Sequence, residues 1–312
     1  MPAVTRIKPR SVFDSEQCRN LGEVSQWRGL ACVAHAWLVI VTTLIVCTMW
    51  SHPIAWLIAI PVLGGRQLGL AILMHDGAHG LLHPNRRIND FVARWLCGEP
   101  VGATLSSYRQ VHFQHHKFTQ QPEDPDLGLS APFPVTRRSL WRKAWRDLSG
   151  QTFMKQRLSL KADPLTSSSD KPSTGQDEAT RASQRFWLGH IVACVAMVLL
   201  GWGVAFALWF VALATWFQLA IRVRNIAEHA CTATGPDPFT HARTTNAGFA
   251  ARALVAPYWV NYHAEHHLFT WIPCYALPRA HRLLKTGGHL TKMTVAPGYL
   301  SVLRQVSPPE PI

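Results

Sequence analysis

The segment from Leu30 to Trp50 contains no charged side chain over 21 positions. An α-helix rises about 1.5 Å per residue, so this run is long enough to cross a hydrocarbon layer of about 30 Å. A cleaved signal peptide is the weaker interpretation, because 29 residues with several charges precede the run and no small-residue cleavage site follows it. Only 16% of the chain is charged, against about 25% in soluble domains. The chain is therefore predicted to be an integral membrane protein.

Three further apolar segments have lengths suited to crossing a bilayer. The second follows the short turn Ser51 to Pro53, so the first two spans are expected to form a helical hairpin. Residues 187–221 carry no charge over 35 positions, which is too long for one span, and Gly201 and Gly203 indicate a turn near the centre. The predicted fold is all-α, with four transmembrane helices in two hairpins at about 30–50, 54–74, 186–201 and 204–221.

The positive charges predict the orientation of these spans. Of 31 Lys and Arg residues, 30 fall in residues 1–29, 75–185 and 222–312, and neither predicted outer turn carries one. By the positive-inside rule these three segments, with both termini, are cytoplasmic, and a bacterial inner membrane is the expected location. The net charge of +13 then reflects topology and lipid headgroups, so a nucleic-acid partner is not expected. Arg66 is the one charge within a span, and the sequence assigns it no role.

The sequence also predicts how the chain is organised. We expect a cytoplasmic N-terminal segment at 1–29, a membrane domain at 30–290 and a C-terminal tail at 291–312. The Ser/Thr/Asp/Pro-rich residues 162–184 are predicted to be a flexible loop, and the short apolar residues 91–105 a membrane-surface or re-entrant piece. The seven cysteines are scattered and odd in number, which argues against a disulfide scaffold.

Nine of the 16 histidines fall in four short clusters. Spacings of i, i+4 or i, i+3, i+4 place imidazoles on one face of a helix. All four clusters lie in segments predicted to be cytoplasmic, so a helical cap carrying them is expected on that side. The clusters are HDGAH, HFQHH, the end of NIAEH, and HAEHH, with the histidines His75, His79, His112, His115, His116, His229, His263, His266 and His267.

Nine imidazoles exceed the four ligands of a structural zinc site and suit two metal ions with open positions. Imidazole alone does not distinguish Fe, Zn, Cu and Ni, but two metals in an apolar setting with unactivated C–H bonds favour iron. Acids near the clusters are predicted to orient the neutral imidazoles from a second shell, namely Asp76, Glu228 and Glu265. The acidic patch Glu123, Asp124 and Asp126 fits a solvated loop equally well.

In these motifs the sequence resembles the membrane fatty acid desaturase family of histidine-box di-iron enzymes. HDGAHG, HFQHHKFTQQPEDPDL and NYHAEHHLFTWIPCYALPRAHRLL carry the resemblance, which spans about residues 30–290. It implies two Fe ions held by the eight box histidines and His229, with Asn225 reaching iron through a water; a helix-end cap is the other role considered for Asn225. No further catalytic acid or base is expected. Thr270 and Trp271 depart from the proline common in the family, which leaves the substrate open.

The resemblance implies an oxidoreductase that acts on paired donors. O2 is the co-substrate and is reduced to water while a carbon–carbon double bond forms in a fatty acyl substrate among membrane lipids. A separate ferredoxin-type or cytochrome-type donor with its reductase supplies electrons. Alternatives are a carotenoid ketolase or hydroxylase, another histidine-box oxygenase, or a non-enzymatic metal transporter. The remaining histidines receive no role. His35 and His190 are expected in the apolar core. The others are expected at loops or the surface, namely His52, His83, His241, His281 and His289.

Overall fold

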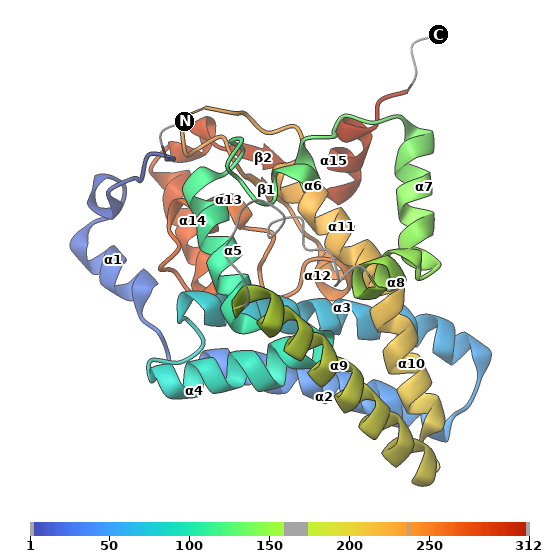
Figure 1. Ribbon diagram of the computed structural model, residues 1–312. Helices are drawn as coiled ribbons and strands as arrows, with labels where there is room; N and C mark the ends of the chain where they lie inside the picture. The colour runs from blue at the N-terminus through green and yellow to red at the C-terminus, as the bar shows by residue number, and fades with distance from the viewer. Residues whose placement is uncertain (1–2, 159–173, 236, 310–312) are drawn as a thin grey trace.

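The computed structural model describes residues 3–158, 174–235 and 237–309. Four of its helices are long and apolar enough to cross a membrane: Arg28–Met49, Pro53–His79, Thr180–Leu199 and Gly203–His229. The described residues are otherwise mostly in shorter helices, and one small sheet of two strands is present among them (Figure 1). This architecture confirms the predicted all-α membrane fold with four spans.

The first two spans, α2 (Arg28–Met49) and α3 (Pro53–His79), form an antiparallel hairpin. The reversal is encoded locally. Pro53 occupies the first turn of α3, where a missing N–H costs nothing, and the His52 side chain accepts a hydrogen bond from the Ile54 N–H. At the other end, Gly80 adopts a left-handed conformation with φ of +81°, which ends α3 directly after His79.

Helix α3 lies at the centre of the fold. It contacts α2, α5, α10 and α11, and its residues from Leu63 to Ala78 are buried except for Ala71. Arg66 is among them, and its guanidinium donates to the Arg252 and Ala253 carbonyl oxygens at 3.1 and 2.7 Å. This charge, which the sequence placed within a predicted span, is thus paired with polar backbone groups.

The third and fourth spans make the second hairpin. Helix α9 (Thr174–Leu199) reverses through Gly201, whose φ is +78°, into α10 (Gly203–Ala214), and α11 (Trp216–His229) continues the span after a break at Thr215. The prediction of a flexible loop over 162–184 is wrong for its second half. Residues 174–184 belong to α9, because polar residues with good helix propensity extend the apolar span, while 162–173 lie outside the described residues.

Short elements connect the spans and build the cap. They are η1 (Pro9–Ser11), α1 (Ser15–Gly22), α4 (Arg86–Phe91), the π-helix η2 (Val92–Gly98), η3 (Glu99–Val101), α5 (Leu105–Phe118), α6 (Leu127–Ser130), α7 (Arg137–Leu148), α8 (Gln151–Leu158), β1 (Arg243–Thr245), α12 (Phe249–Leu254), α13 (His263–Leu268), η5 (Cys274–Ala276), α14 (Leu277–Thr286), η6 (His289–Lys292), β2 (Thr294–Ala296) and α15 (Tyr299–Val306). Strands β1 and β2 pair in parallel, with Thr244 opposite Val295.

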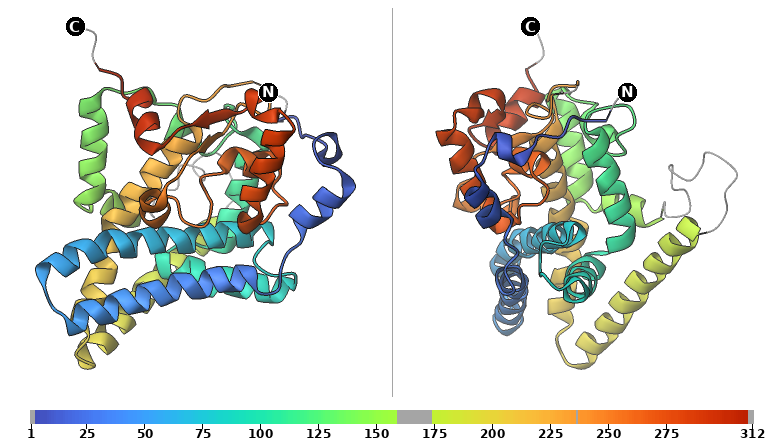
Figure 2. Two further views of the ribbon diagram at one scale, coloured as in Figure 1. Left: turned by 180° about the vertical axis from the view of Figure 1, so that it is seen from behind. Right: turned by 90° about the vertical axis from the view of Figure 1, so that its left-hand side faces the viewer.

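The cap lies on one side of the α2–α3 layer. Helices α5, α13, α14 and α15 stand together above this layer, and the two views of Figure 2 place the same elements on the same side. Residues 91–105, predicted to be a membrane-surface piece, form η2 and η3, and η2 packs against α3. His35, expected in the core, is an exposed residue of α2 whose Nδ1 lies 3.0 Å from the Tyr258 hydroxyl, and His190 is half-buried.

Candidate metal centre

Four helices bring the clustered histidines together. The last turn of α3 carries His75 and His79, α5 carries the HFQHH motif, α11 ends on His229, and α13 begins with HAEHH. Spacings of three and four residues place the members of each motif on one helical face. Histidines of the second and fourth of these helices thus meet although 150 residues separate, for example, His116 of α5 and His266 of α13.

The end of α3 is held firmly at the centre. The Asn89 amide donates to the Gly77 carbonyl at 2.9 Å, and the Arg109 guanidinium donates to the Ala78 carbonyl at 2.9 Å. Both carbonyls lie in the last turn of the helix, where i+4 backbone donors run out, and the Gly77 carbonyl also accepts from the Gly80 N–H at 3.1 Å. Gly77 also permits a close approach of η2, since a Cβ there would lie 2.3 Å from the Ala93 Cβ. His75 and His79 are therefore carried on a capped, tightly packed turn.

The nine predicted histidines form two groups. The first group has five imidazoles, and one nitrogen from each lies within 4.8 Å of the others. Neighbouring Nε2 atoms are close: His112 lies 3.0 Å from His79 and 2.8 Å from His116, and His116 lies 3.0 Å from His266. The members are His75, His79, His112, His116 and His266.

The second group has four imidazoles from α5, α11 and α13. Its closest pair is His263 and His229, whose Nε2 atoms are 2.8 Å apart. The ring of His115 lies 4.8 Å from that of His229 and 5.0 Å from that of His267, measured between centroids. The members are His115, His229, His263 and His267. The two groups adjoin, because the His116 and His267 ring centroids are 4.3 Å apart.

Burial favours the neutral form of five of these imidazoles. Loss of solvent, followed by the repulsion of neighbouring imidazoles, lowers the pKa of members of both groups far below the ordinary histidine value. Outside the spans this applies to His112, His116, His263, His266 and His267. A neutral imidazole is the form that binds a metal ion.

The geometry fits a metal ion in each group. A metal–imidazole bond is about 2.0–2.1 Å long, so two nitrogens at right angles around one ion lie about 3 Å apart. The short nitrogen pairs of both groups have this separation. In addition, both nitrogens of His75 and the Nε2 of His267 are buried with no hydrogen-bond partner among the described residues. Buried polar atoms of this kind call for a ligand.

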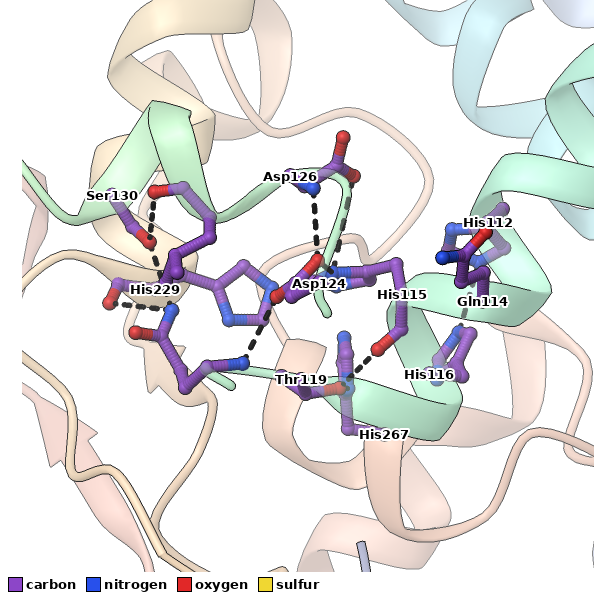
Figure 3. A network of polar contacts seen from close by, with 12 residues as sticks. His112, Gln114, His115, His116, Thr119, Asp124, Asp126, Ser130, His229 and His267 are labelled. Carbon is purple, nitrogen blue, oxygen red and sulfur yellow. Dashed lines mark hydrogen bonds and ion pairs between the residues drawn. The ribbon is translucent and has the colours of Figure 1, made fainter. Parts of the chain in front are cut away.

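Asp124 is a partner of the second group that the sequence left undecided. Its carboxylate is buried and lies 2.8 Å from His115 Nδ1, as Figure 3 shows, and it also accepts from the backbone N–H groups of Gln120 and Asp126 at 2.9 and 2.8 Å. Because this contact occupies Nδ1, the Nε2 of His115 is the nitrogen that can bind a metal ion. The charged-loop interpretation is wrong for Asp124, and Glu123 is exposed. In the sequence, the DPD motif that follows HFQHH is the feature that could have indicated this role of Asp124.

The three acids predicted to orient the histidines differ in their contacts. Glu228 lies 3.4 Å from His263 Nδ1 and pairs with Arg224 at 2.6 Å. Asp76 accepts the Cys274 N–H at 2.9 Å, while its other oxygen is 3.7 Å from His75. Among the described residues, the Glu265 carboxylate pairs with Thr244 and His281 and with no clustered histidine. Its carboxylate is fully buried between Thr244 and His281, so it fixes α13 rather than an imidazole.

Two histidines without an expected role support the centre. His281, predicted at the surface, is half-buried with its Nδ1 2.5 Å from the Glu265 carboxylate. His241, also predicted at a loop or the surface, is buried, and its carbonyl oxygen lies 3.1 Å from His229 Nδ1. Neither contact has a signal in the local sequence, because both depend on chain segments that meet only in the folded protein. Asn225 lies within α11 rather than at its end, so a cap role is excluded.

The Asp124 contact makes a specific prediction. Replacing Asp124 with asparagine should lower the metal affinity of the second group by about 10–100-fold, because the imidazole of His115 loses its carboxylate partner. Metal per protein after graded chelation measures this. The matched control is Asp126→Asn in the same loop, whose carboxylate lies 3.9 Å from His115, beyond hydrogen-bond distance. Equal affinities for D124N and the unmodified protein would contradict the assignment.

Comparison with known proteins agrees with this geometry. The family model described as fatty acid desaturase matches residues 51–295, which include all nine clustered histidines. The chain is 26% identical over 270 residues to a dihydrorhizobitoxine desaturase of Bradyrhizobium elkanii, covering 82% of this chain and 76% of that protein. It is 24% identical over 269 residues to a beta-carotene ketolase of Paracoccus sp. (strain PC1), covering 83% of this chain and 91% of the ketolase.

Proposed function

Because the chain belongs to the fatty acid desaturase family, we propose that it is a membrane-bound di-iron enzyme that uses O2 to introduce a carbon–carbon double bond into a fatty acyl chain. The observation that carries the proposal is the pair of adjoining imidazole groups, five and four in number, at the ends of spanning helices. The nine histidines would hold two metal ions, one in each group.

Iron is the metal proposed for both groups. Imidazole suits several metals, but the substrates available in a membrane have unactivated C–H bonds, and iron when bound supplies the oxygen activation that such bonds require. The chain's own residues keep the imidazoles neutral, fix their orientation through Asp124 and the His241 carbonyl, and surround them with a buried apolar core. The acyl chain is removed from water and held beside the centre.

Asn225 is proposed to reach iron through a water molecule. It lines a cavity of about 30 Å³ together with His115, His229 and His263 of the second group. A cavity of this size holds a water if polar partners surround it. Arg224 and Glu228 also line the cavity and supply such partners.

The proposed enzyme has a defined orientation in the membrane and receives its electrons from a separate protein. The histidine-bearing side and both termini are placed in the cytoplasm of a bacterial cell, in accord with the distribution of Lys and Arg. A separate ferredoxin-type or cytochrome-type donor with a reductase delivers two electrons for each double bond, and the substrate contributes the other two that reduce O2 to water.

A carotenoid oxygenase is the second candidate. The similarity to a beta-carotene ketolase covers 91% of that protein, more than the 76% covered of the desaturase relative, although the identity is lower. The ketolase similarity therefore favours a long apolar substrate without specifying an acyl chain. The two candidates share the metal centre and differ in their products.

Product analysis distinguishes the candidates. The chain is expressed in a host without desaturases, supplied with a donor system, and its lipids are analysed by mass spectrometry beside those of a His267→Ala control. We expect unsaturated acyl chains, 2 mass units lighter than their precursors, only with the unmodified protein. Oxygenated carotenoids in a carotenoid-producing host would instead support the ketolase. Stable zinc binding without reductant-dependent O2 uptake would overturn both and indicate a metal-binding protein that is not an enzyme.

A further inference from the structure

Helix α7 (Arg137–Leu148) stands at one edge of the molecule beside α11, and contacts fix it at both ends (Figure 1). At its start, the Val135 N–H donates to the Val306 carbonyl of α15 at 2.9 Å. At its end, the buried Asp147 accepts from Arg222 of α11 at 2.8 Å and from the Thr152 hydroxyl at 2.5 Å. These contacts hold the helix beside α11 and α15 without closing the space between them.

The space between these three helices is an apolar groove. Its volume is about 660 Å³. Leu140, Trp141, Ala144 and Leu148 line it from α7; Leu219, Val223 and Ile226 line it from α11; Leu300 and Leu303 line it from α15. A saturated acyl chain of lipid length fits this volume, because a methylene group occupies roughly 30 Å³, about the volume of one water.

The rim of the groove is positively charged. Arg137, Arg222 and Arg304 line it, one from each helix. Arg222 is neutralised by Asp147, but Arg137 and Arg304 are exposed and have no acidic partner among the described residues. Two unpaired guanidinium groups beside an apolar slot match a ligand with an anionic head and an apolar tail.

The groove also lies at the level where a bilayer ends. Leu219 and Val223 belong to the fourth candidate span, whose uncharged stretch stops at Arg222. Helix α7 itself carries two exposed tryptophans, Trp141 (75% exposed) and Trp145 (67% exposed), which alternate with Arg138, Arg142 and Arg146. Exposed tryptophans interleaved with basic residues are typical of helices that lie in a membrane interface.

We propose that the groove between α7, α11 and α15 binds one anionic phospholipid of the surrounding bilayer. An acyl chain occupies the apolar slot, and the phosphate contacts Arg137 and Arg304 at the rim. The site is separate from the metal centre and does not depend on which reaction the metals perform. Its occupant is a lipid rather than a free anion because the slot presents mainly carbon to its ligand.

Native mass spectrometry tests the site with the full chain in phosphatidylcholine nanodiscs, with and without phosphatidylglycerol. The unmodified protein is expected to retain one phosphatidylglycerol molecule in preference to phosphatidylcholine. In the variant Arg137→Gln/Arg304→Gln this preference should fall about fivefold for each arginine, roughly 25-fold in total. In the unmodified protein the preference should weaken as the salt concentration rises. Ala144→Trp, which fills the slot and keeps both arginines, should also reduce retention.

The control variant is Arg279→Gln/Arg282→Gln, which removes two exposed arginines from α14 on another part of the surface. It should retain phosphatidylglycerol as the unmodified protein does. Equal retention by the R137Q/R304Q variant and the control would overturn the proposal. Thermal stabilisation by inorganic phosphate as large as that by phosphatidylglycerol would also overturn it, since the apolar slot would then contribute nothing.

Discussion

Replacing His267 with alanine is expected to leave a folded protein that binds one metal ion instead of two and forms no product. His267 is one of four imidazoles in its group, so three remain, and the affinity of that group should fall by more than about 100-fold. His79→Ala should have a smaller effect on metal binding, because its group of five keeps four imidazoles. Metal per protein, measured by inductively coupled plasma mass spectrometry after dialysis, compares the two variants.

The control for this pair is His289→Ala. The His289 ring stacks on Phe239, 6.3 Å between centroids, and belongs to neither group. Its metal content and activity should match those of the unmodified protein. Equal metal loss in H79A and H267A would contradict the division into five and four, and full metal content in H267A would contradict its assignment as a ligand.

Removing the guanidinium of Arg243 is expected to destabilise the whole fold. This side chain is 1% exposed, and it donates to the Ala230, Ala227 and Ile226 carbonyls at 2.7, 3.1 and 3.4 Å. Those carbonyls belong to the last turn of α11, the helix that carries His229. The Ile226 carbonyl also accepts from the Ala230 N–H at 3.0 Å, so Arg243→Ala removes the side-chain donor of the Ala227 and Ala230 carbonyls above all. A loss of about 3–5 kcal/mol follows, which lowers the melting temperature by about 10 °C.

Thermal unfolding followed by size-exclusion chromatography measures this loss. Arg252→Ala is the matched control, because the Arg252 side chain is exposed and should contribute less than about 0.5 kcal/mol. Arg243→Lys keeps the charge but reaches fewer carbonyls, so its stability should lie between the two. A melting temperature of R243A equal to that of R252A would show that solvent or a neighbouring group caps α11.

The spans could be predicted because their physics is local. Long uncharged runs, Pro53 at a helix start and Gly201 at a turn specify the two hairpins without reference to the rest of the chain. The exact ends of the helices could not be predicted as well from the sequence. Helix α3 continues through HDGAH instead of ending before it, since the last turn is stabilised by Asn89 and Arg109, which come from later segments.

The clustered histidines could be predicted from the sequence because their spacing matches one face of a helix. The residues that hold these histidines in place could not be predicted in this way. Asp124 is distinguished from Glu123 only by the fold, which buries one carboxylate against His115 and leaves the other exposed. His281 and Glu265 meet because α14 packs on α13, a contact between residues 16 positions apart. Spacing patterns report ligands, whereas the groups that orient ligands depend on tertiary packing.

The uninterrupted run of α3 from Pro53 to His79 has a practical consequence for protein engineering. Three of the nine histidines, His75, His79 and His229, stand on helices that are also candidate spans. A truncated, water-soluble fragment containing only the cap would lack two imidazoles of one group and one of the other. Efforts to obtain a detergent-free catalyst from this protein must therefore keep the spanning helices and redesign their lipid-facing surfaces instead of deleting them.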